Sequence, residues 1–317
     1  MIKRVSLITG VAGTIGSNLA KDLIKNDHYV YGIDNFSLGK IENIKNILKN
    51  KNFRLIKCDL SNIDKIEKYN VNIKKKIDYM WLLAANSDIK AGVNDPNVDL
   101  KNTFFTTKNS LVFFYSKLKT NARIFFASSS AVFGSKKNIL NENEKKYFPI
   151  SGYGENKLLS EIFIDDFCKR KKLKYIVARF PNVVGKPFTH GVIFDLANKI
   201  QKNNLLKVLG NGTQQKPYIH VSELIGCIKF MMYKKKVENL YLLGPNDKGI
   251  TVKKIVDLLC KYFNFKKKII YGKKNFGWNG DVPKYFYNVK KLNKTGFKFK
   301  LSSHQAIKLA IKEKYDN

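Results

Sequence analysis

The sequence has 317 residues, of which 59 are Lys or Arg and 25 are Asp or Glu, and its formal net charge is therefore +34. This length predicts one large domain or two smaller ones, and the hydrophobic content of 44% excludes a wholly disordered chain. No apolar run approaches the roughly 18 residues that a membrane-spanning helix needs. No signal peptide precedes the first predicted strand. We therefore expect a soluble, cytoplasmic protein with no membrane partner.

The positive charge comes mostly from lysine, because only five of the 59 basic residues are arginines. Proteins that read nucleic acids favour arginine, whose guanidinium group makes paired hydrogen bonds to bases and phosphates. No nucleic-acid-binding motif accompanies the lysines, so we expect weak polyanion binding at low salt but no specific nucleic-acid partner. The four Cys and four His residues are scattered without metal-ligand spacing, which predicts that no metal is bound.

The N-terminal segment has the pattern of a dinucleotide-binding unit. A strand predicted over Val5–Ile8 leads into a glycine-rich turn and a helix predicted over Ser17–Asn26, and a second strand, His28–Ile33, ends at Asp34. Glycines let the backbone approach a pyrophosphate, whose charge the free N–H groups at the start of the helix bind. The Asp34 carboxylate is placed to bind both ribose hydroxyls and would repel a 2′-phosphate. This arrangement predicts NAD rather than NADP.

Two later segments carry the groups for proton transfer. The predicted strand Arg123–Ala127 is followed by Ser-Ser-Ser-Ala-Val-Phe-Gly over residues 128–134, and a predicted helix opens with Tyr153 and Lys157. Residues four apart share one face of a helix, so the phenol and the ammonium point into the same space. The ammonium favours the phenolate, and the positive nicotinamide ring of NAD should act in the same direction. Together we expect them to bring the Tyr153 pKa from the usual value of about 10 towards neutral pH. Tyr153 is therefore a candidate general base.

Together, the Thr-Gly-x-x-Gly-x-x-Gly turn, the Ser-Ser-x-x-Val-Phe-Gly segment and the Tyr-x-x-x-Lys helix resemble the extended short-chain dehydrogenase/reductase family, in particular its NAD-dependent epimerases and dehydratases. The resemblance runs in order through almost the whole chain. It implies that Ser129, Tyr153 and Lys157 are catalytic. It also implies a set of NAD-binding residues, which are Gly10, Gly13, Thr14, Ile15, Gly16, Asp34, Asn35, Asp59, Leu60, Ala84, Ala85, Asn102, Tyr153 and Lys157.

The same resemblance implies a nucleotide-sugar site, in which Asn182 contacts the diphosphate and Asp281 the nucleotide ribose. Lys216 and Trp278 stand where the family usually has Arg, so the first position keeps its charge and the second loses it. Tyr285 matches a position where a bulky side chain narrows the pocket against N-acetyl groups; the alternative is a tyrosine that serves only packing. The full implied set is Ser130, Asn182, Val192, Lys216, Tyr218, Trp278, Asp281 and Tyr285.

The order of strands and helices predicts an α/β fold with a doubly wound parallel sheet, a Rossmann fold, and a smaller α/β C-terminal lobe. The cofactor is expected at the carboxyl ends of the strands. We predict that residues 1–185 and 217–243 form the NAD-binding domain. Residues 186–216 and 244–317 are then the nucleotide-sugar-binding lobe.

Members of the family mostly oxidise a hydroxyl of a nucleotide-diphosphate sugar with NAD. Dehydratases and decarboxylases carry Asp or Glu just after the catalytic hydroxyl, where this chain has Ser130 and Ala131, neither an adequate acid or base. The sequence therefore favours epimerisation at C4 through a 4-keto intermediate, with UDP-glucose and UDP-galactose as the favoured substrates. A dehydratase, a reductase, an epimerase of acetamido or uronic-acid sugars, and a non-catalytic NAD-sensing protein are the alternatives. The sequence leaves the pathway open between galactose use and polysaccharide synthesis.

The family resemblance also implies a homodimer. Helices predicted over Asn102–Leu118 and Tyr153–Arg170 would pair with their copies in a four-helix bundle. The second helix carries more apolar side chains than one buried face requires.

Overall fold

The computed structural model describes residues 4–68, 73–135, 139–188, 191–278 and 280–316. It divides into two compact units. The first unit contains Met1–Val132, Ser151–Arg179 and Ile228–Tyr241, and the second contains Phe133–Ile150, Phe180–Cys227 and Leu242–Asn317. Each unit is described separately below.

The first unit is built on a sheet of seven strands in the order β12-β7-β5-β4-β1-β2-β3. The strands β5, β4, β1, β2 and β3 pair in parallel, each with the next. The order reverses beside β1, as in doubly wound folds, where ligands bind at the carboxyl ends of the strands next to that switch point. The bounds are β1 Arg4–Thr9, β2 His28–Asp34, β3 Phe53–Lys57, β4 Ile77–Leu82, β5 Leu118–Ser129, β7 Lys174–Phe180 and β12 Leu240–Leu242.

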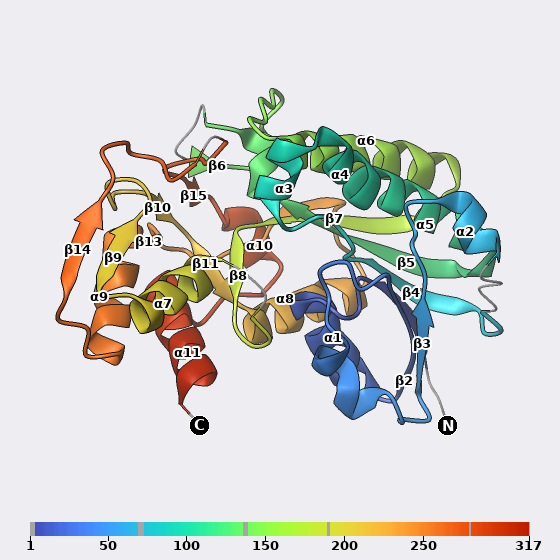
Figure 1. Cartoon of the computed structure of the whole chain (residues 1–317). Coiled ribbons are helices and arrows are strands. Elements are labelled where there is room, and N and C mark those ends of the chain that lie inside the picture. Colours follow the sequence, from blue (N-terminus) through green and yellow to red (C-terminus); the bar gives the residue numbers. More distant parts are fainter. Residues whose placement is uncertain (1–3, 69–72, 136–138, 189–190, 279, 317) are drawn as a thin grey trace. The chain divides into compact units, whose positions relative to one another are not determined.

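Helices cover both faces of this sheet: α1 lies on one face and α5 and α6 lie on the other (Figure 1). Successive residues of β1, such as Leu7 and Ile8, are therefore both fully buried. On the α5 and α6 side the core includes Met80, Phe126 and Ile164. The helices of this unit are α1 Thr14–Lys25, α2 Ile63–Lys68, α3 Ile89–Asn94, α4 Pro96–Asp99, α5 Thr106–Phe114 and α6 Gly152–Arg170, with a 3-10 helix at Ile41–Ile47.

The helix that we predicted over Asn102–Leu118 is wrong as a continuous α-helix. A π-helical segment, Leu100–Phe105, precedes α5, and a 3-10 turn, Tyr115–Lys117, follows it. Threonine hydroxyls bond back to main-chain carbonyls four or five residues earlier and satisfy acceptors in the widened turn. The helix ends early because Leu118 already begins β5.

The second unit consists of short strand pairs and helices around a separate core. The pairs are β8 Asn182–Val184 with β11 Tyr218–His220, β9 Leu205–Val208 with β14 Lys268–Tyr271, β10 Gln215–Lys216 with β13 Ile250–Thr251, and β6 Ile139–Leu140 with β15 Phe286–Tyr287. The helices are α7 Val192–Lys202, α9 Val252–Tyr262, α10 Lys290–Lys294 and α11 Ser303–Tyr315. The remaining helix, α8 Val221–Tyr233, begins in this unit and ends in the first. Apolar residues of α7, α9 and α11 supply most of the core.

The compact units do not follow the predicted domain boundaries. Residues 133–150, 180–185, 217–227 and 242–243, which we assigned to the NAD-binding domain, belong to the second unit. The physical reason is that β8 pairs with β11, and both strands pack against α11. Which ligand each unit binds stays a prediction.

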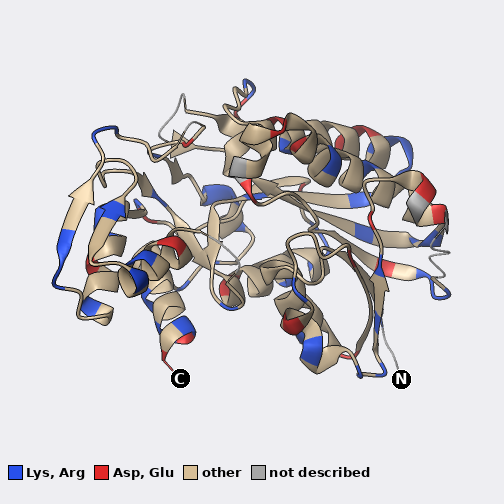
Figure 2. Cartoon of the chain, viewed as in Figure 1, with Lys and Arg blue, Asp and Glu red and all other residues tan. Residues whose placement is uncertain are grey.

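Lysine and arginine positions occur along the helices and strands of both units and outnumber the acidic ones (Figure 2). No helix in the described part of the chain combines the length and the apolar composition that crossing a membrane would require.

Candidate active site

In the glycine-rich turn between β1 and α1, two glycines lie so close to other main-chain atoms that a side chain would not fit. Gly10 adopts a positive φ of 71°, and a Cβ atom there would lie 2.9 Å from the Ala84 main chain. A Cβ atom on Gly16 would overlap the carbonyl oxygen of Gly10. Gly13 is the N-cap of α1, and no side chain caps the first N–H groups of this helix. This turn has the geometry of a pyrophosphate cradle.

The Asp34 carboxylate joins the end of β2 to this turn. One oxygen accepts a hydrogen bond from the Ala12 N–H at 2.8 Å, and the other accepts one from the Phe36 N–H at 2.8 Å. Burial raises the Asp34 pKa, and hydrogen bonds from the main chain at Ala12, Phe36 and Asn35 oppose that rise. The fixed carboxylate beside the turn fits the predicted contact with the ribose hydroxyls of NAD.

Other predicted NAD residues lie at the ends of neighbouring strands. Asp59 and Leu60 follow β3, and Asp59 accepts hydrogen bonds from both the N–H and the hydroxyl of Ser61. Ala84 and Ala85 follow β4; the Ala84 N–H donates to Thr9 Oγ1 at 3.2 Å. Asn102 lies in the π-helical segment and is half-buried.

Ser129 and Tyr153 are brought together from β5 and α6. Their side chains are hydrogen-bonded to each other. Ser129 Oγ also accepts a hydrogen bond from the Ala131 N–H at 3.1 Å. Ser130, at the start of the next 3-10 turn, is buried. The hydroxyl pair is the expected proton-transfer element of the site.

Lys157 lies one turn after Tyr153 on the same face of α6. Its ammonium is 5.7 Å from the centre of the Tyr153 ring and 4.8 Å from that of Phe126. It donates a hydrogen bond to the Ala127 carbonyl at 2.6 Å. Only 2% of Lys157 is exposed, and this burial lowers its pKa to about 7.

The groups of this chain alone do not lower the Tyr153 pKa, and the lowering expected with NAD in place stays a prediction. Burial raises the Tyr153 pKa to about 12, the hydrogen bond with Ser129 lowers it, and the charge of Asp99 raises it. The sequence argument counted the nearby ammonium and omitted the loss of hydration. It also omitted a carboxylate from another helix.

A buried ion pair that we did not predict lies one turn from Lys157 and favours its charged form. Glu161 lies one further turn along α6, and its carboxylate binds Arg179 of β7 with distances of 2.5 Å to Nη2 and 2.9 Å to Nε. Glu161 also accepts a hydrogen bond from the Ser128 hydroxyl. Its charge raises the Lys157 pKa against the effect of burial. The signal in the sequence was the spacing of Tyr153, Lys157 and Glu161 by four residues each.

The second unit brings four predicted substrate residues together. Asn182 and Tyr218 are register partners in β8 and β11, and their side chains are hydrogen-bonded. Lys216 forms an ion pair with Asp281, whose other carboxylate oxygen accepts a hydrogen bond from the Gly277 N–H at 3.0 Å. Burial raises the Tyr218 pKa, and the charge of Asp281 raises it further.

The remaining predicted substrate residues are less closely linked to that cluster. The Trp278 carbonyl accepts a hydrogen bond from the Asp281 N–H at 3.1 Å. Tyr285 is buried, and its ring centre lies 6.0 Å from that of Tyr287. Val192 starts α7 and packs against the core of the second unit.

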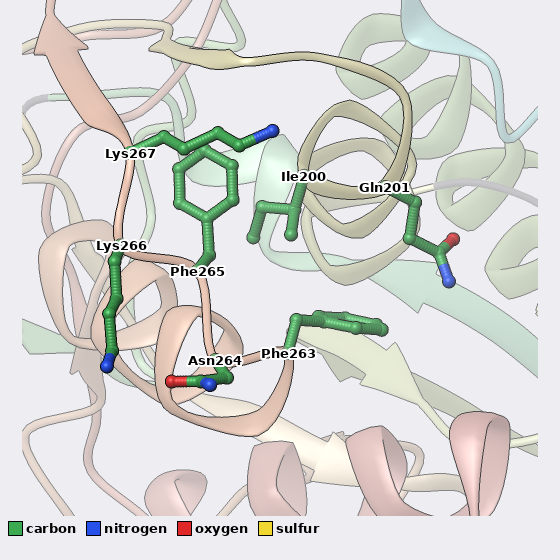
Figure 3. Close-up of a pocket in the computed structure, with 7 residues that line it drawn as sticks. All are labelled: Ile200, Gln201, Phe263, Asn264, Phe265, Lys266 and Lys267. Carbon is green, nitrogen blue, oxygen red and sulfur yellow. The ribbon is translucent and has the colours of Figure 1, made fainter.

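A surface pocket in the second unit is separate from this cluster (Figure 3). It lies beside the C-terminal part of α7 and the segment after α9, and it contains none of the predicted site residues. Its lining residues are Ile200, Gln201, Phe263, Asn264, Phe265, Lys266 and Lys267. Within the described ranges no group of three or more His, Cys, Asp and Glu side chains could hold a metal ion.

Comparison with known proteins places this geometry in a family. The profile of the NAD-dependent epimerase/dehydratase family matches residues 6–244. A protein of Methanocaldococcus jannaschii to which UDP-glucose 4-epimerase activity is ascribed is 25% identical over 310 residues, which cover 96% of each chain. ADP-L-glycero-D-manno-heptose-6-epimerase of Brachyspira hyodysenteriae is 28% identical over 262 residues, which cover 77% of this chain and 74% of that protein.

Among solved structures, a UDP-galactose 4-epimerase superposes with a TM-score of 0.81 and 25% identity over 98% of each chain. The doubly wound sheet and the predicted cofactor agree with the family. The chain therefore belongs to the NAD-dependent epimerase/dehydratase family, and it is an NAD-dependent enzyme that acts on a nucleotide sugar.

Proposed function

We propose that the protein inverts the configuration at C4 of a nucleotide-diphosphate hexose, with UDP-glucose and UDP-galactose as the favoured pair. The observation that carries the proposal is the hydrogen-bonded pair Ser129 and Tyr153 beside Lys157. The two residues after Ser129 are Ser130 and Ala131, so they supply no acid that would favour loss of water. The names of the related epimerases support the same reaction.

In this proposal the glycine-rich turn and Asp34 hold NAD, which supplies the hydride acceptor and donor. Tyr153 removes the proton from the C4 hydroxyl. Ser129 donates a hydrogen bond to the same oxygen as it becomes a ketone. Lys157 holds its positive charge beside the phenolate through its bond to the Ala127 carbonyl. After the 4-keto sugar has rotated so that the other face of C4 would receive the hydride back, Tyr153 returns the proton to the C4 oxygen.

We assign the nucleotide sugar to the cluster in the second unit. The Lys216 ammonium provides positive charge for a diphosphate, and Asp281 holds that ammonium in place. Asn182 and Tyr218 supply an amide and a hydroxyl next to it. We propose Tyr285 as the wall that disfavours N-acetyl groups. Its replacement by serine should raise the use of acetamido sugars roughly 10- to 100-fold, as expected for one wall contact.

We also propose that the protein forms a homodimer. α5 and α6 pack against each other in the first unit. Three of their apolar side chains are exposed: Val112 by 44%, Leu159 by 41% and Ile162 by 59%. Their number on two adjacent helices fits a second copy of this chain better than solvent.

Proton NMR of the protein incubated with NAD and UDP-galactose tests the reaction. We expect UDP-glucose to appear and approach equilibrium without net NADH formation. A matched sample of the Ser129→Ala variant should convert far more slowly, because it lacks the hydroxyl that bonds the reacting oxygen. Net reduction of NAD, or loss of water from the sugar, would contradict epimerisation and support a dehydrogenase or a dehydratase. Conversion of UDP-N-acetylgalactosamine or UDP-glucuronic acid, with none of UDP-galactose, would overturn the substrate assignment alone.

A further inference from the structure

Glu161 is a buried carboxylate of the first unit that the proposed reaction does not use. It lies on α6 and is 8% exposed. Arg179 of β7 donates to it from Nε at 2.9 Å and from Nη2 at 2.5 Å. The Ser128 hydroxyl of β5 donates to the same oxygen as Nε does. One carboxylate therefore connects a helix to two neighbouring strands of the sheet.

The partners of this carboxylate are as dry as the carboxylate itself. Ser128 is 1% exposed and Arg179 is 2% exposed. A buried ion pair adds little stability compared with apolar side chains of the same volume, because both charges lose their hydration. Its hydrogen bonds have fixed directions, however, and they are stronger when a partner is charged and water is excluded. The pair is thus better suited to fixing the positions of its neighbours than to adding stability.

α6 is hydrogen-bonded to β5 at two successive residues of the strand. Lys157 donates to the Ala127 carbonyl at 2.6 Å, and the next residue, Ser128, donates to Glu161. The two helix residues are four positions apart, which is about 6 Å along the axis at 1.5 Å per residue. A single bond would let the helix rotate about the point of contact. Two bonds at this separation fix the direction of α6 relative to β5.

Both bonds lie next to the hydroxyl pair of the site. Ser129 follows Ser128 directly, and Tyr153 lies one turn before Lys157 on α6. The side chains of Ser129 and Tyr153 are hydrogen-bonded to each other. The bond that Ser129 Oγ accepts from the Ala131 N–H is local and does not connect it to α6. A shift of the end of β5 against α6 would therefore lengthen the bond between the two hydroxyls.

We propose that Glu161 and Ser128 are positioning residues for Ser129. The Glu161 carboxylate, which Arg179 holds, binds the Ser128 hydroxyl. This link keeps Ser129 within hydrogen-bond distance of Tyr153. The proposal rests on the catalytic roles proposed for Ser129 and Tyr153. Its effect on rate is large for a single hydrogen bond, because a displacement of about 1 Å in a catalytic group can cost about 100-fold.

The Ser128→Ala variant tests the link and keeps the Glu161–Arg179 pair. With only one of the two bonds to α6 lost, we expect kcat to fall by about 10-fold, while KM for the sugar and the NAD content stay close to the wild-type values. Ser128→Thr keeps the hydroxyl and should restore most of the rate. Ser160→Ala is the matched control: Ser160 is fully buried on α6, and its hydroxyl donates to the Asn156 carbonyl within the helix. Its kcat should equal that of the wild type.

The pH dependence of kcat provides a readout that a loss of folded protein would not move. The hydrogen bond with Ser129 lowers the Tyr153 pKa, so a weaker bond raises it. Ser128→Ala leaves the charges of Lys157 and Asp99 in place, so a shift reports the hydrogen bond alone. Because Tyr153 must lose its proton to act as a base, the acid limb of kcat should move to higher pH. Ser129→Ala should move it in the same direction.

The assay uses whichever of UDP-galactose, UDP-N-acetylgalactosamine and UDP-glucuronic acid the wild-type protein converts, so a wrong sugar assignment does not affect it. A wild-type kcat and acid limb in Ser128→Ala, or an equal loss in Ser160→Ala, would overturn the proposal. If Ser128→Ala does not fold, Glu161→Met combined with Arg179→Met replaces the pair by apolar side chains of similar length, which proteins often tolerate. This double variant should show the same loss in kcat, and an unchanged kcat would equally overturn the proposal.

Failure of the proposed function gives a different result. Conversion of none of the three sugars by the wild type, or a wild-type rate in Ser129→Ala, would overturn the catalytic assignment itself. The link is then judged by the ionisation of Tyr153 in NAD-loaded protein, followed by ultraviolet difference absorbance against a Tyr153→Phe sample. A higher Tyr153 midpoint in Ser128→Ala than in the wild type would show that Ser128 positions Ser129, and an unchanged midpoint would show that it does not.

Discussion

The Lys157 ammonium donates a hydrogen bond of 2.6 Å to the carbonyl oxygen of Ala127, two residues before Ser129 on the same strand. This bond connects Lys157, on the face of α6 that also carries Tyr153 and Glu161, to the end of β5. The same face presents Tyr153 one turn earlier and Glu161 one turn later. The relative placement of the hydroxyl groups therefore depends on the contact between one strand and one helix, both in the first unit.

Replacing Tyr153 with Phe should abolish most turnover while leaving NAD bound. The variant keeps the ring beside Lys157 and loses only the hydroxyl that bonds Ser129. We expect kcat to fall by about 10²–10⁴-fold, the usual contribution of a general base. Epimerisation rate and NAD content of the purified protein are the measurements. Tyr115→Phe, on the surface at the end of α5, is the control and should retain full activity. Full activity in Tyr153→Phe would rule out Tyr153 as the base.

We expect alanine substitutions at two glycines of the glycine-rich turn, Gly16 and Gly13, to differ in their effect on stability. Gly16→Ala should lower the free energy of unfolding by about 1–3 kcal/mol, because its Cβ atom would overlap the Gly10 carbonyl. It should also weaken NAD binding by distorting the turn. Gly13→Ala is the matched change: the nearest atom to its Cβ would be at 3.4 Å, and its φ is negative. Urea unfolding of both variants without NAD compares them. Equal stability of the two would show that the close approach at Gly16 is relieved elsewhere.

The buried pair of Glu161 and Arg179 should be sensitive to the loss of one partner. Glu161→Gln removes the carboxylate that pairs with the Arg179 guanidinium, which is 2% exposed. We expect a loss of about 3–5 kcal/mol in unfolding free energy, as for other broken buried pairs. Glu161→Gln combined with Arg179→Gln should be less destabilised than either single variant. Denaturant unfolding measures this double-mutant cycle, and additive losses would contradict a direct coupling.

Burial of His28 predicts that stability falls in acid. Its ring lies 2.9 Å from Ser6 Oγ and 3.1 Å from the Tyr233 hydroxyl, and burial and the charge of Arg4 lower its pKa to about 4. In the unfolded chain the pKa is near 6.5, so the unfolded state takes up a proton first as the pH falls. The stabilisation is thus present above about pH 6.5 and is lost as the pH falls towards 4.

At about 1.4 kcal/mol for each unit of pKa difference, discounted for solvent screening, we expect a loss of about 1–3 kcal/mol from this residue. Urea unfolding of His28→Gln should show a smaller difference between about pH 7.5 and about pH 4.5 than the wild-type protein shows. His304→Gln, at an exposed position, is the control. Identical pH dependence in His28→Gln and the wild type would assign the acid sensitivity to carboxyl groups instead.

Local patterns predicted much of the first unit. The turn between β1 and α1, the acid at the end of β2, and the Tyr-x-x-x-Lys spacing are set by residues a few positions apart, and each is present in the structure. The π-helical segment before α5 was not predictable, because its apolar pattern also fits an ordinary helix.

Contacts between residues far apart in the sequence could not be predicted, for a different reason. Glu161 has the sequence pattern of a solvent-exposed acid on a helix, and its burial is explained by its contacts with Arg179 on β7 and Ser128 on β5. Asp99 is an acid at the end of a four-residue helix, and its effect on Tyr153 depends on how α4 packs against α6. The link between Lys216 and Asp281 likewise joins residues far apart in the chain. Such pairs depend on tertiary packing, which a single sequence does not give.

The exposed apolar residues of α5 and α6 predict how the dimer can be broken. Ile162 is 59% exposed, and Ile162→Glu would place a charge in the middle of the proposed bundle without disturbing the core of the first unit. Sedimentation should show a dimer for the wild-type protein and a 36.5 kDa monomer for the variant. Ile63→Glu, which alters an exposed isoleucine at the start of α2, should leave the dimer intact. A wild-type protein that sediments only as a monomer would refute the dimer. A dimer that survives Ile162→Glu would place the interface on another surface. Tyr153 and Ser129 come from one chain, so a folded monomeric variant should still catalyse epimerisation. Any loss of activity would measure how much dimerisation stabilises α6.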